Sequence, residues 1–219
     1  MPRRKFACNA RPGGSSERDG KARRGPQAVN ERPTAHRHTE PSVHATQFPL
    51  AARIVAEHAA TLGRDVAAYG NHVCRGLHFY VALSAGAPAP EAVQVAAGFH
   101  DLGIWTHDTF DYLGPSMDLA SSWLEQHGRQ VLDAEVRAII GQHHKLRPYT
   151  GPHAESVERF RRADLIDLSL GLLPRGLSRE TIRAVRGAFP NAGFHRRLAM
   201  LTLRQCVRDP LHPLPMFRW

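Results

Sequence analysis

Residues 93–103 read VQVAAGFHDLG, an apolar segment that ends in a His-Asp pair. The apolar residues do not alternate with polar ones, so the segment favours a buried helix over a half-buried strand. Pro90 precedes it, and proline suits the first turn of a helix. We therefore expect a helix from Glu91 to about Leu102 that carries His100 and Asp101 at its end.

Apolar residues at helical spacing recur on both sides of this segment, and no alternating strand pattern of useful length appears. Gly63, Ser116, Asp133 and Ser178 are placed to cap helices. The expected helices cover residues 50–62, 65–84, 91–102, 116–128, 133–143, 154–170, 178–187 and 194–207. The predicted fold class is therefore all-α, with about seven or eight helices and a loop at 106–115.

The composition is that of a globular protein. With 42% hydrophobic and 22% charged residues among 219, the chain is neither collagen-like nor disordered throughout. It contains no apolar run of about 18 residues, which a membrane-spanning helix needs. Residues 1–48 carry +6 of the net charge of +9 and few apolar residues. We expect 1–48 to be a disordered basic tail and 49–219 to form one helical domain.

The three cysteines, Cys8, Cys74 and Cys206, are widely spaced and form no CxxC motif. This spacing argues against a disulfide framework and against a thiolate zinc site. The basic N-terminal residues are not followed by the apolar stretch of a secretory signal. We therefore expect a reducing, cytoplasmic location.

Ionisable side chains interrupt four of the expected apolar helix faces. They are His72, the His100-Asp101 pair, the His143-His144 pair and Asp164. Burying such groups is costly unless they are paired or bound to a metal. Imidazole nitrogens and carboxylate oxygens together are ligands for a divalent transition metal. Ligands from separate helices would hold a bundle around one centre.

This ordered series resembles the HD-domain (His-Asp) metal-dependent phosphohydrolase superfamily. The segments that carry the resemblance are NHVCR at 71–75, FHDLG at 99–103, IIGQHH at 139–144 and RADLID at 162–167. They are similar to the family's first-histidine helix, HD signature, later histidine helix and final aspartate helix. The resemblance covers roughly residues 50–170.

The resemblance implies an HD-domain-like helical bundle whose metal ligands are His72, His100, Asp101 and Asp164. Asp167, one turn after Asp164, is the rival ligand. Family members with two metals carry further histidines before the final aspartate, and Ser116 stands where one of them is expected. The resemblance therefore implies one divalent transition metal ion (Mn, Fe, Co, Ni or Zn), with His143 as an additional ligand or a substrate group.

The function implied is that of a divalent-metal-dependent hydrolase. A phosphohydrolase that acts on a phosphomonoester or nucleotide through metal-activated water is the first expectation. Asp101 and His143 are the expected catalytic residues, because Asp101 is placed both to ligate the ion and to take the proton of the water.

Three residues near the expected ligands are the candidates for binding substrate. Arg75, one turn from His72, is suited to a phosphate group, and His144 and Lys145 follow the expected catalytic histidine. The expected partner is thus a small, phosphorylated molecule, with nucleic acid bound only through the basic tail and no membrane partner. Homo-oligomerisation is left open.

Two other classes of function stay open. An HD-fold hydratase/lyase or oxygenase would use similar helices on a small, non-phosphorylated substrate. A phosphate substrate predicts a cationic pocket, whereas a small neutral one predicts an apolar, closed pocket. The other class is a non-catalytic helical module that binds a nucleotide or a nucleic acid through the basic tail.

Overall fold

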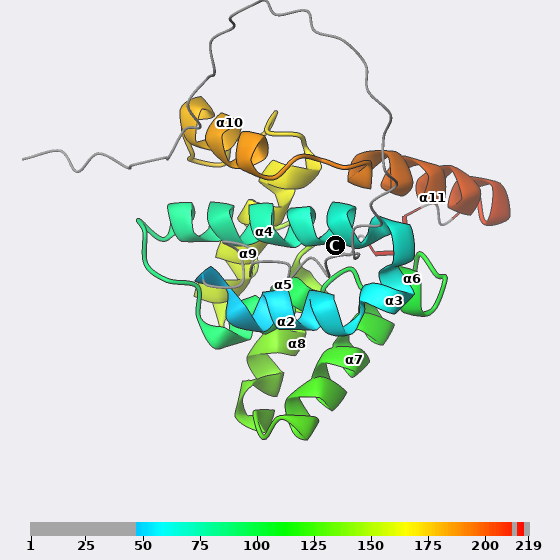
Figure 1. The fold of residues 1–219 in the computed structure, drawn as a ribbon, viewed down its shortest axis with the longest axis horizontal. Helices are drawn as coiled ribbons and strands as arrows, with labels where there is room; N and C mark the ends of the chain where they lie inside the picture. Colours follow the sequence, from blue (N-terminus) through cyan, green and yellow to red (C-terminus); the bar gives the residue numbers. More distant parts are fainter. Residues whose placement is uncertain (1–46, 212–213, 217–219) are drawn as a thin grey trace, which may run out of the picture. The chain divides into compact units, whose positions relative to one another are not determined.

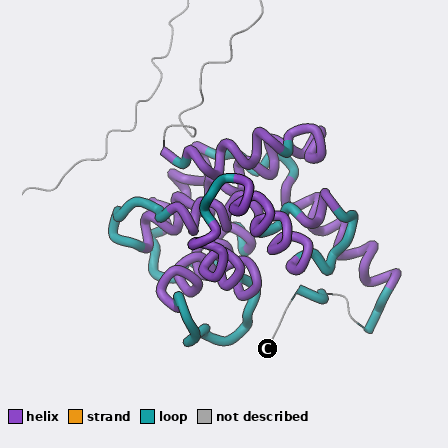
Figure 2. Tube along the Cα trace, turned by 90° about the horizontal axis from the view of Figure 1, so that it is seen from below, coloured by secondary structure: helices purple, strands orange, loops and turns teal. Residues whose placement is uncertain are grey.

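The computed structural model describes residues 47–211 and 214–216, and this part of the chain is helical without a single strand (Figure 1, Figure 2). Eight of its α-helices have nine or more residues, which confirms the predicted fold class. The elements are α2 (Pro49–Glu57), α3 (Ala59–Leu62), a 3₁₀ turn (Gly63–Asp65), α4 (Val66–Leu83), α5 (Glu91–Phe99), α6 (Gly103–Thr106), α7 (Leu113–Gln126), a second 3₁₀ turn (Gln130–Leu132), α8 (Asp133–Gln142), α9 (Ala154–Leu168), α10 (Arg179–Ala188) and α11 (Phe194–Arg208).

Helix α5 is the central element of the core. All eight residues from Ala92 to Phe99 are buried, as expected of a helix that is apolar all round. It packs against α2, α4, α7 and α8. Because α5 is surrounded in this way, the residues that follow it begin inside the protein and not at its surface.

Helices α4 and α9 pack along one another and cover a further side of α5 (Figure 1). Their shared core includes Tyr69, Val73 and Leu77 from α4 with Phe160 and Ala163 from α9. Both helices also bury ionisable side chains on the same faces. The packing that builds the core therefore also brings these polar groups together.

Three of the predicted helix boundaries are wrong, and side-chain hydrogen bonds account for two of the differences. The helix expected at 50–62 breaks at His58, whose ring Nδ1 bonds the carbonyl of Ile54. The helix from Glu91 ends at Phe99 and not near Leu102, because the ring of His100 takes the carbonyl of Ala97. Helix α7 begins at Leu113 and thus shortens the expected loop.

Of the four predicted helix caps, two are confirmed and two are wrong. Gly63 ends α3 with a φ of +54°, and the Ser178 hydroxyl accepts the Thr181 N–H at the start of α10, so both predictions are confirmed. Ser116 and Asp133 are not caps. The Ser116 hydroxyl is buried and accepts the N–H of Gly103, while the Asp133 carboxylate accepts from another side chain.

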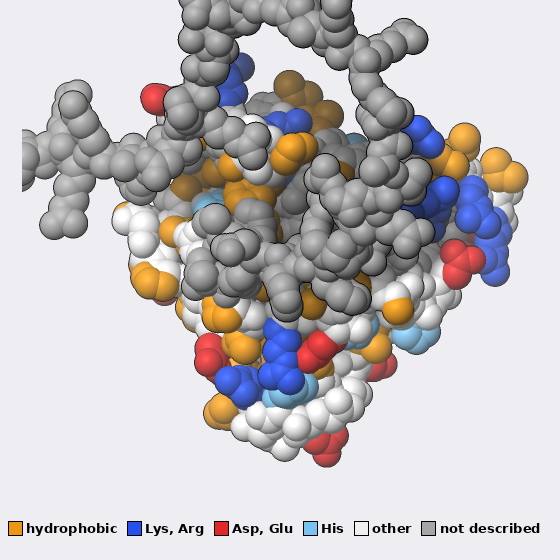
Figure 3. Space-filling model, viewed as in Figure 1, with side chains coloured by type: hydrophobic (Ala, Val, Ile, Leu, Met, Phe, Trp, Pro, Cys, Tyr) orange, Lys and Arg blue, Asp and Glu red, His pale blue; other side chains and the backbone are white. Residues whose placement is uncertain are grey.

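Helix α11 contacts the rest of the fold through its inner face, which includes the buried Phe194 and the partly buried Leu198. Its outer face exposes Leu203, Arg204 and Val207. Basic and hydrophobic side chains accordingly gather on the right of Figure 3, where α11 lies. The outer residues are therefore not needed to build the core.

Within the residues that the structure describes, no helix is both long and apolar enough to cross a lipid bilayer. The predicted disordered tail at 1–48 lies outside the described residues, apart from Gln47 and Phe48. The proposed boundary between tail and domain stays a prediction.

Candidate metal centre

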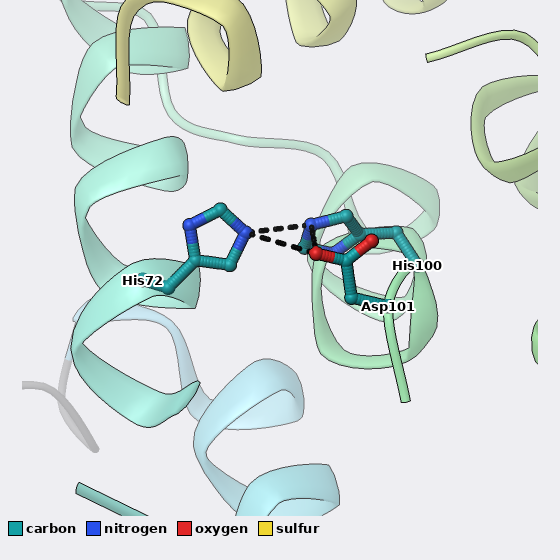
Figure 4. A group of neighbouring side chains, drawn as sticks. All are labelled: His72, His100 and Asp101. Carbon is teal, nitrogen blue, oxygen red and sulfur yellow. Dashed lines mark hydrogen bonds and ion pairs between the residues drawn. The ribbon is translucent and has the colours of Figure 1, made fainter. Parts of the chain in front are cut away.

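Three helical segments bring two histidine and two aspartate side chains to one point in the core. His72 projects from the middle of α4, while His100 and Asp101 occupy the turn that ends α5 (Figure 4). Asp164 reaches the same point from α9. All four side chains are buried. The four residues expected to ligate a metal are thus adjacent in space.

The separations between their donor atoms suit ligands around one ion. Nε2 of His72 lies 2.9 Å from Nε2 of His100 and 3.5 Å from Oδ2 of Asp101. Oδ1 of Asp164 lies 3.6 and 3.8 Å from the same two nitrogens. Adjacent ligands with bonds of about 2.1 Å are about 3.0 Å apart in octahedral and about 3.4 Å apart in tetrahedral geometry. The observed separations span these values.

Both imidazoles are held in the tautomer that ligates a metal through Nε2. Nδ1 of His100 lies 2.9 Å from the carbonyl oxygen of Ala97, and Nδ1 of His72 lies 2.7 Å from Oδ2 of Asp167. Because these oxygens only accept hydrogen bonds, Nδ1 must carry the proton. The neutral rings therefore direct two nitrogen lone pairs at each other, an arrangement that a cation between them would stabilise.

The electrostatics of the two rings show that the site attracts one positive charge. Burial opposes charging of His72, but its interactions with Asp101 and Asp167 outweigh burial and raise its pKa to about 9. Burial, together with the charges of His72 and His143, outweighs the attraction of Asp101 and lowers the pKa of His100 to about 3. In the absence of a metal, a proton on His72 therefore takes the place of the cation.

The two carboxylates differ in their electrostatic surroundings. Burial acts to raise the pKa of Asp101, but the neighbouring His100 and His143 hold it well below its usual range. Burial, with repulsion from Asp101, outweighs the attraction of His143 and His72 and raises the pKa of Asp164 to about 6. A divalent cation would relieve this repulsion between the two aspartates.

A second group of possible ligands adjoins the first one. Oδ1 of Asp101 lies 3.5 Å from Nε2 of His143, and both atoms are buried without a hydrogen-bond partner in the described part of the chain. The His143 ring is oriented like the other two, since its Nδ1 lies 2.7 Å from the carbonyl oxygen of Ile140. With His144, these residues form a further set that could hold a cation.

The phenol of Tyr112 adjoins this second group. The residue lies in the loop after the His-Asp pair, a place suited to a substrate lid or an acid donor, but it is not among the site residues predicted from the sequence. Its hydroxyl lies 2.6 Å from Nε2 of His144, and the residue is buried at the start of α7. Burial raises its pKa well above the usual value, and the charges of Asp101 and Asp164 add to this. A tyrosine in a loop gives no periodic signal, so its position depends on the fold of residues 107–112.

The three residues expected to bind substrate lie in different surroundings. The Arg75 guanidinium is buried and engaged by Asp167 and by backbone carbonyls, which favours a positioning role over substrate contact. His144 faces Tyr112, as described above. The Lys145 ammonium lies over the ring of Tyr149, 5.7 Å from its centroid, at the start of the connection to α9.

Asp167, the rival of Asp164, does not face the centre. Its carboxylate bonds the Nδ1 side of His72, and burial is outweighed by hydrogen bonds from His72 and Arg75, which lower its pKa. The geometry thus separates the two aspartates of α9. Asp164 adjoins Nε2 of His72, whereas Asp167 fixes the opposite side of that ring.

Comparisons with known proteins found no relative of this chain. No family model matches the chain, and neither the curated proteins nor the solved structures gave a match. What the described residues establish is an all-helical fold with buried His/Asp groups that could hold a metal ion.

Proposed function

We propose that this chain is a divalent-metal-dependent hydrolase of the HD type. The observation that carries the proposal is the convergence of two Nε2 atoms, 2.9 Å apart, with carboxylate oxygens of Asp101 and Asp164 in the core. A buried cluster of this composition is costly unless a cation compensates it. The order of its residues along the chain is also that of the family resemblance.

The residues around the centre support water-dependent chemistry. A divalent ion held there would supply Lewis acidity and would lower the pKa of a coordinated water towards neutrality. Oδ1 of Asp101 points away from the His72–His100 pair and lies beside His143, so it can accept a proton from such a water. The Nε2 atom of His143 can then hold that proton, since Nδ1 remains bonded to the Ile140 carbonyl.

A phosphomonoester or nucleotide is the substrate class that the family resemblance puts first. Beside the centre, His144 and Lys145 are the residues that we propose for contact with a phosphate. Both follow the end of α8. They belong to the segment that joins α8 to α9 and can change conformation without disturbing the core helices.

A second substrate class has structural support of its own. The rings of Tyr69 and Phe160 pack against His100. Arg75, the expected phosphate ligand, is committed to Asp167. Such aromatic surroundings suit a small uncharged substrate, to which water would be added by the same residues.

The test is the metal content of the purified full-length chain, measured by inductively coupled plasma mass spectrometry after growth with added metals. We expect about one equivalent of a divalent transition metal in the wild type and a loss in Asp101→Asn. Asp108→Asn is the matched control, because His107-Asp108 is a second His-Asp pair on an exposed loop. A wild-type protein that binds no metal after titration would refute the proposal.

Activity assays of the metal-loaded protein then distinguish the two substrate classes. Turnover of phosphomonoesters or nucleotides would establish the phosphohydrolase, whereas turnover confined to uncharged small molecules would establish the second class. Two equivalents of metal would mean that Asp101, His143 and His144 form a second ion site, and would reopen the oxygenase alternative.

A further inference from the structure

Residues 189–195, which comprise the connection between α10 and α11 and the first two residues of α11 and are called the connection below, lie beside His72 of the candidate metal centre. Phe194 stacks on the His72 ring with 4.0 Å between ring centroids and 15° between planes, and it is fully buried. The stacking covers a face of the ring, whereas the other candidate ligands lie at its Nε2 edge. The connection belongs to the part of the chain that follows the HD resemblance.

A buried ion pair holds the other side of the same imidazole. Asp167 accepts the Nδ1–H of His72 at 2.7 Å and receives two hydrogen bonds from Arg75, at 2.5 and 2.8 Å. The exposed fractions of Asp167 and Arg75 are 0% and 1%. The carboxylate is thus fixed by both partners and cannot rotate away from His72.

The connection in turn anchors this ion pair. Nη1 of Arg75 donates to the carbonyls of Phe189 and Pro190, at 3.0 and 3.2 Å. Asn71 on α4 donates to the same Pro190 carbonyl at 2.7 Å. The ring of His195 donates through Nε2 to the backbone carbonyl of Asp167 at 3.0 Å. Residues 189–195 therefore contact every member of the chain Arg75–Asp167–His72.

We propose that residues 189–195, acting through Arg75 and Asp167, fix the orientation of His72 and thereby set the metal affinity of the site. This inference rests on the proposed function, because it requires His72 to be a ligand. An imidazole rotates over a broad range about its second side-chain torsion unless its surroundings restrict it. The Nδ1 hydrogen bond and the stacked ring together leave one orientation, in which Nε2 faces His100 and Asp101.

The experiment replaces the ion pair without leaving a buried charge. The double variant Arg75→Met/Asp167→Leu removes both partners at once, and buried ion pairs are often replaced by apolar residues of similar size without loss of folding. We expect the folded variant to bind zinc about 10- to 100-fold more weakly in competition with a chelator, the range found when the partner of a ligating histidine is removed. The d–d spectrum of the cobalt-loaded protein should change with it.

The matched control removes an ion pair from the same helix. Glu155→Leu/Arg159→Met eliminates an exposed pair on α9 with a separation of 2.8 Å, away from the centre. This control should bind zinc as the wild type does. Equal zinc affinity, within about threefold, for wild type and a folded Arg75→Met/Asp167→Leu protein would overturn the inference.

Phe194→Leu is the second variant, and it tests the effect of residues 189–195 on zinc affinity even if the double variant fails to fold. It keeps an apolar side chain and the Arg75–Asp167 pair but removes the ring stacked on His72. We expect weaker zinc binding by about three- to tenfold, and rescue by Phe194→Tyr, which restores an aromatic ring. Unchanged binding by Phe194→Leu would contradict a role for the connection. A wild type without metal affinity refutes the proposed function itself, an outcome distinct from equal affinity in the variants.

Discussion

Gly103, two residues after the His100-Asp101 pair, has no room for a side chain. A Cβ at this position would lie 2.6 Å from the carbonyl oxygen of Tyr112 and 2.9 Å from the hydroxyl of Ser116. The first neighbour is backbone and cannot rotate away. A Gly103→Ala substitution must therefore push α6 away from the start of α7, and the turn that carries Asp101 moves with it.

The size of the effect follows from two opposing contributions. Overpacking of this kind costs about 1–3 kcal/mol. The higher helix propensity of alanine returns about 0.5–1 kcal/mol. The middle of the two ranges leaves a net destabilisation of about 1 kcal/mol, with an upper limit of about 2.5 kcal/mol, and in a domain of this size each kcal/mol lowers Tm by about 2–4 °C.

The assay is thermal unfolding of Gly103→Ala beside Gly76→Ala, followed by zinc titration of both. Gly76 is the matched control, because it lies inside α4 and a Cβ there would meet nothing within 4 Å. We expect Tm to fall by about 2–4 °C, and by at most about 10 °C, in Gly103→Ala and to rise slightly in Gly76→Ala, since only the second has the propensity gain without the overpacking. Zinc affinity should fall only in Gly103→Ala. Equal Tm values for the two variants would refute the steric reasoning.

Three further predictions concern stability. Ser116→Ala removes the acceptor of the buried Gly103 N–H and should cost about 1–3 kcal/mol, seen as a lower urea midpoint; an unchanged midpoint would speak against this hydrogen bond. Adding zinc at about 100 times its Kd should stabilise the wild type by about 2.7 kcal/mol, and a chelator should reverse the gain. Asp101→Asn should respond to neither, and a response in that variant would exclude Asp101 as a ligand. Burial acts to raise the pKa of Glu158, but hydrogen bonds from Arg161 and the Tyr149 N–H lower it below its ordinary value of 4.5. Its stabilisation is therefore present above about pH 4.5 and is lost as the pH falls through the lowered pKa, so the difference in Tm between wild type and Glu158→Gln should be constant near pH 7 and shrink as the pH falls below about 4.5; a difference that does not change with pH would contradict this.

Much of the fold was predictable because apolar periodicity determines which face of each helix is buried. Residues 92–99 are all buried and all apolar except Gln94, so the central helix could be assigned from this apolar run and from the proline that precedes it. The boundaries near His58 and His100 were missed. At His100 the ring takes the Ala97 carbonyl that the helix would otherwise use, and at His58 the ring shares the Ile54 carbonyl with the backbone N–H of the same residue. Periodicity carries no information about such bonds.

The candidate centre was predictable to the extent that ionisable residues on buried faces require partners. His72, His100, Asp101 and Asp164 could be identified on this ground, and the structure places them together. Their roles as ligands remain proposals.

The surroundings of the centre could not be predicted in the same way. Whether Arg75 faces a substrate or the carboxylate of Asp167 depends on the relative rotation of α4 and α9. Tyr112 reaches His144 through an irregular loop. Both positions follow from tertiary packing, which a single helix face does not specify.

The hydrogen bond between His72 and Asp167 joins residues 95 positions apart in the chain. Contacts of such long range form late, because the loop that they close must first lose its conformational freedom. Since synthesis proceeds from the N-terminus, His72, His100 and Asp101 emerge from the ribosome well before α9. A nascent chain holds only part of the ligand set until α9 has been made, and firm capture of an ion would therefore mark the moment at which α9 has docked.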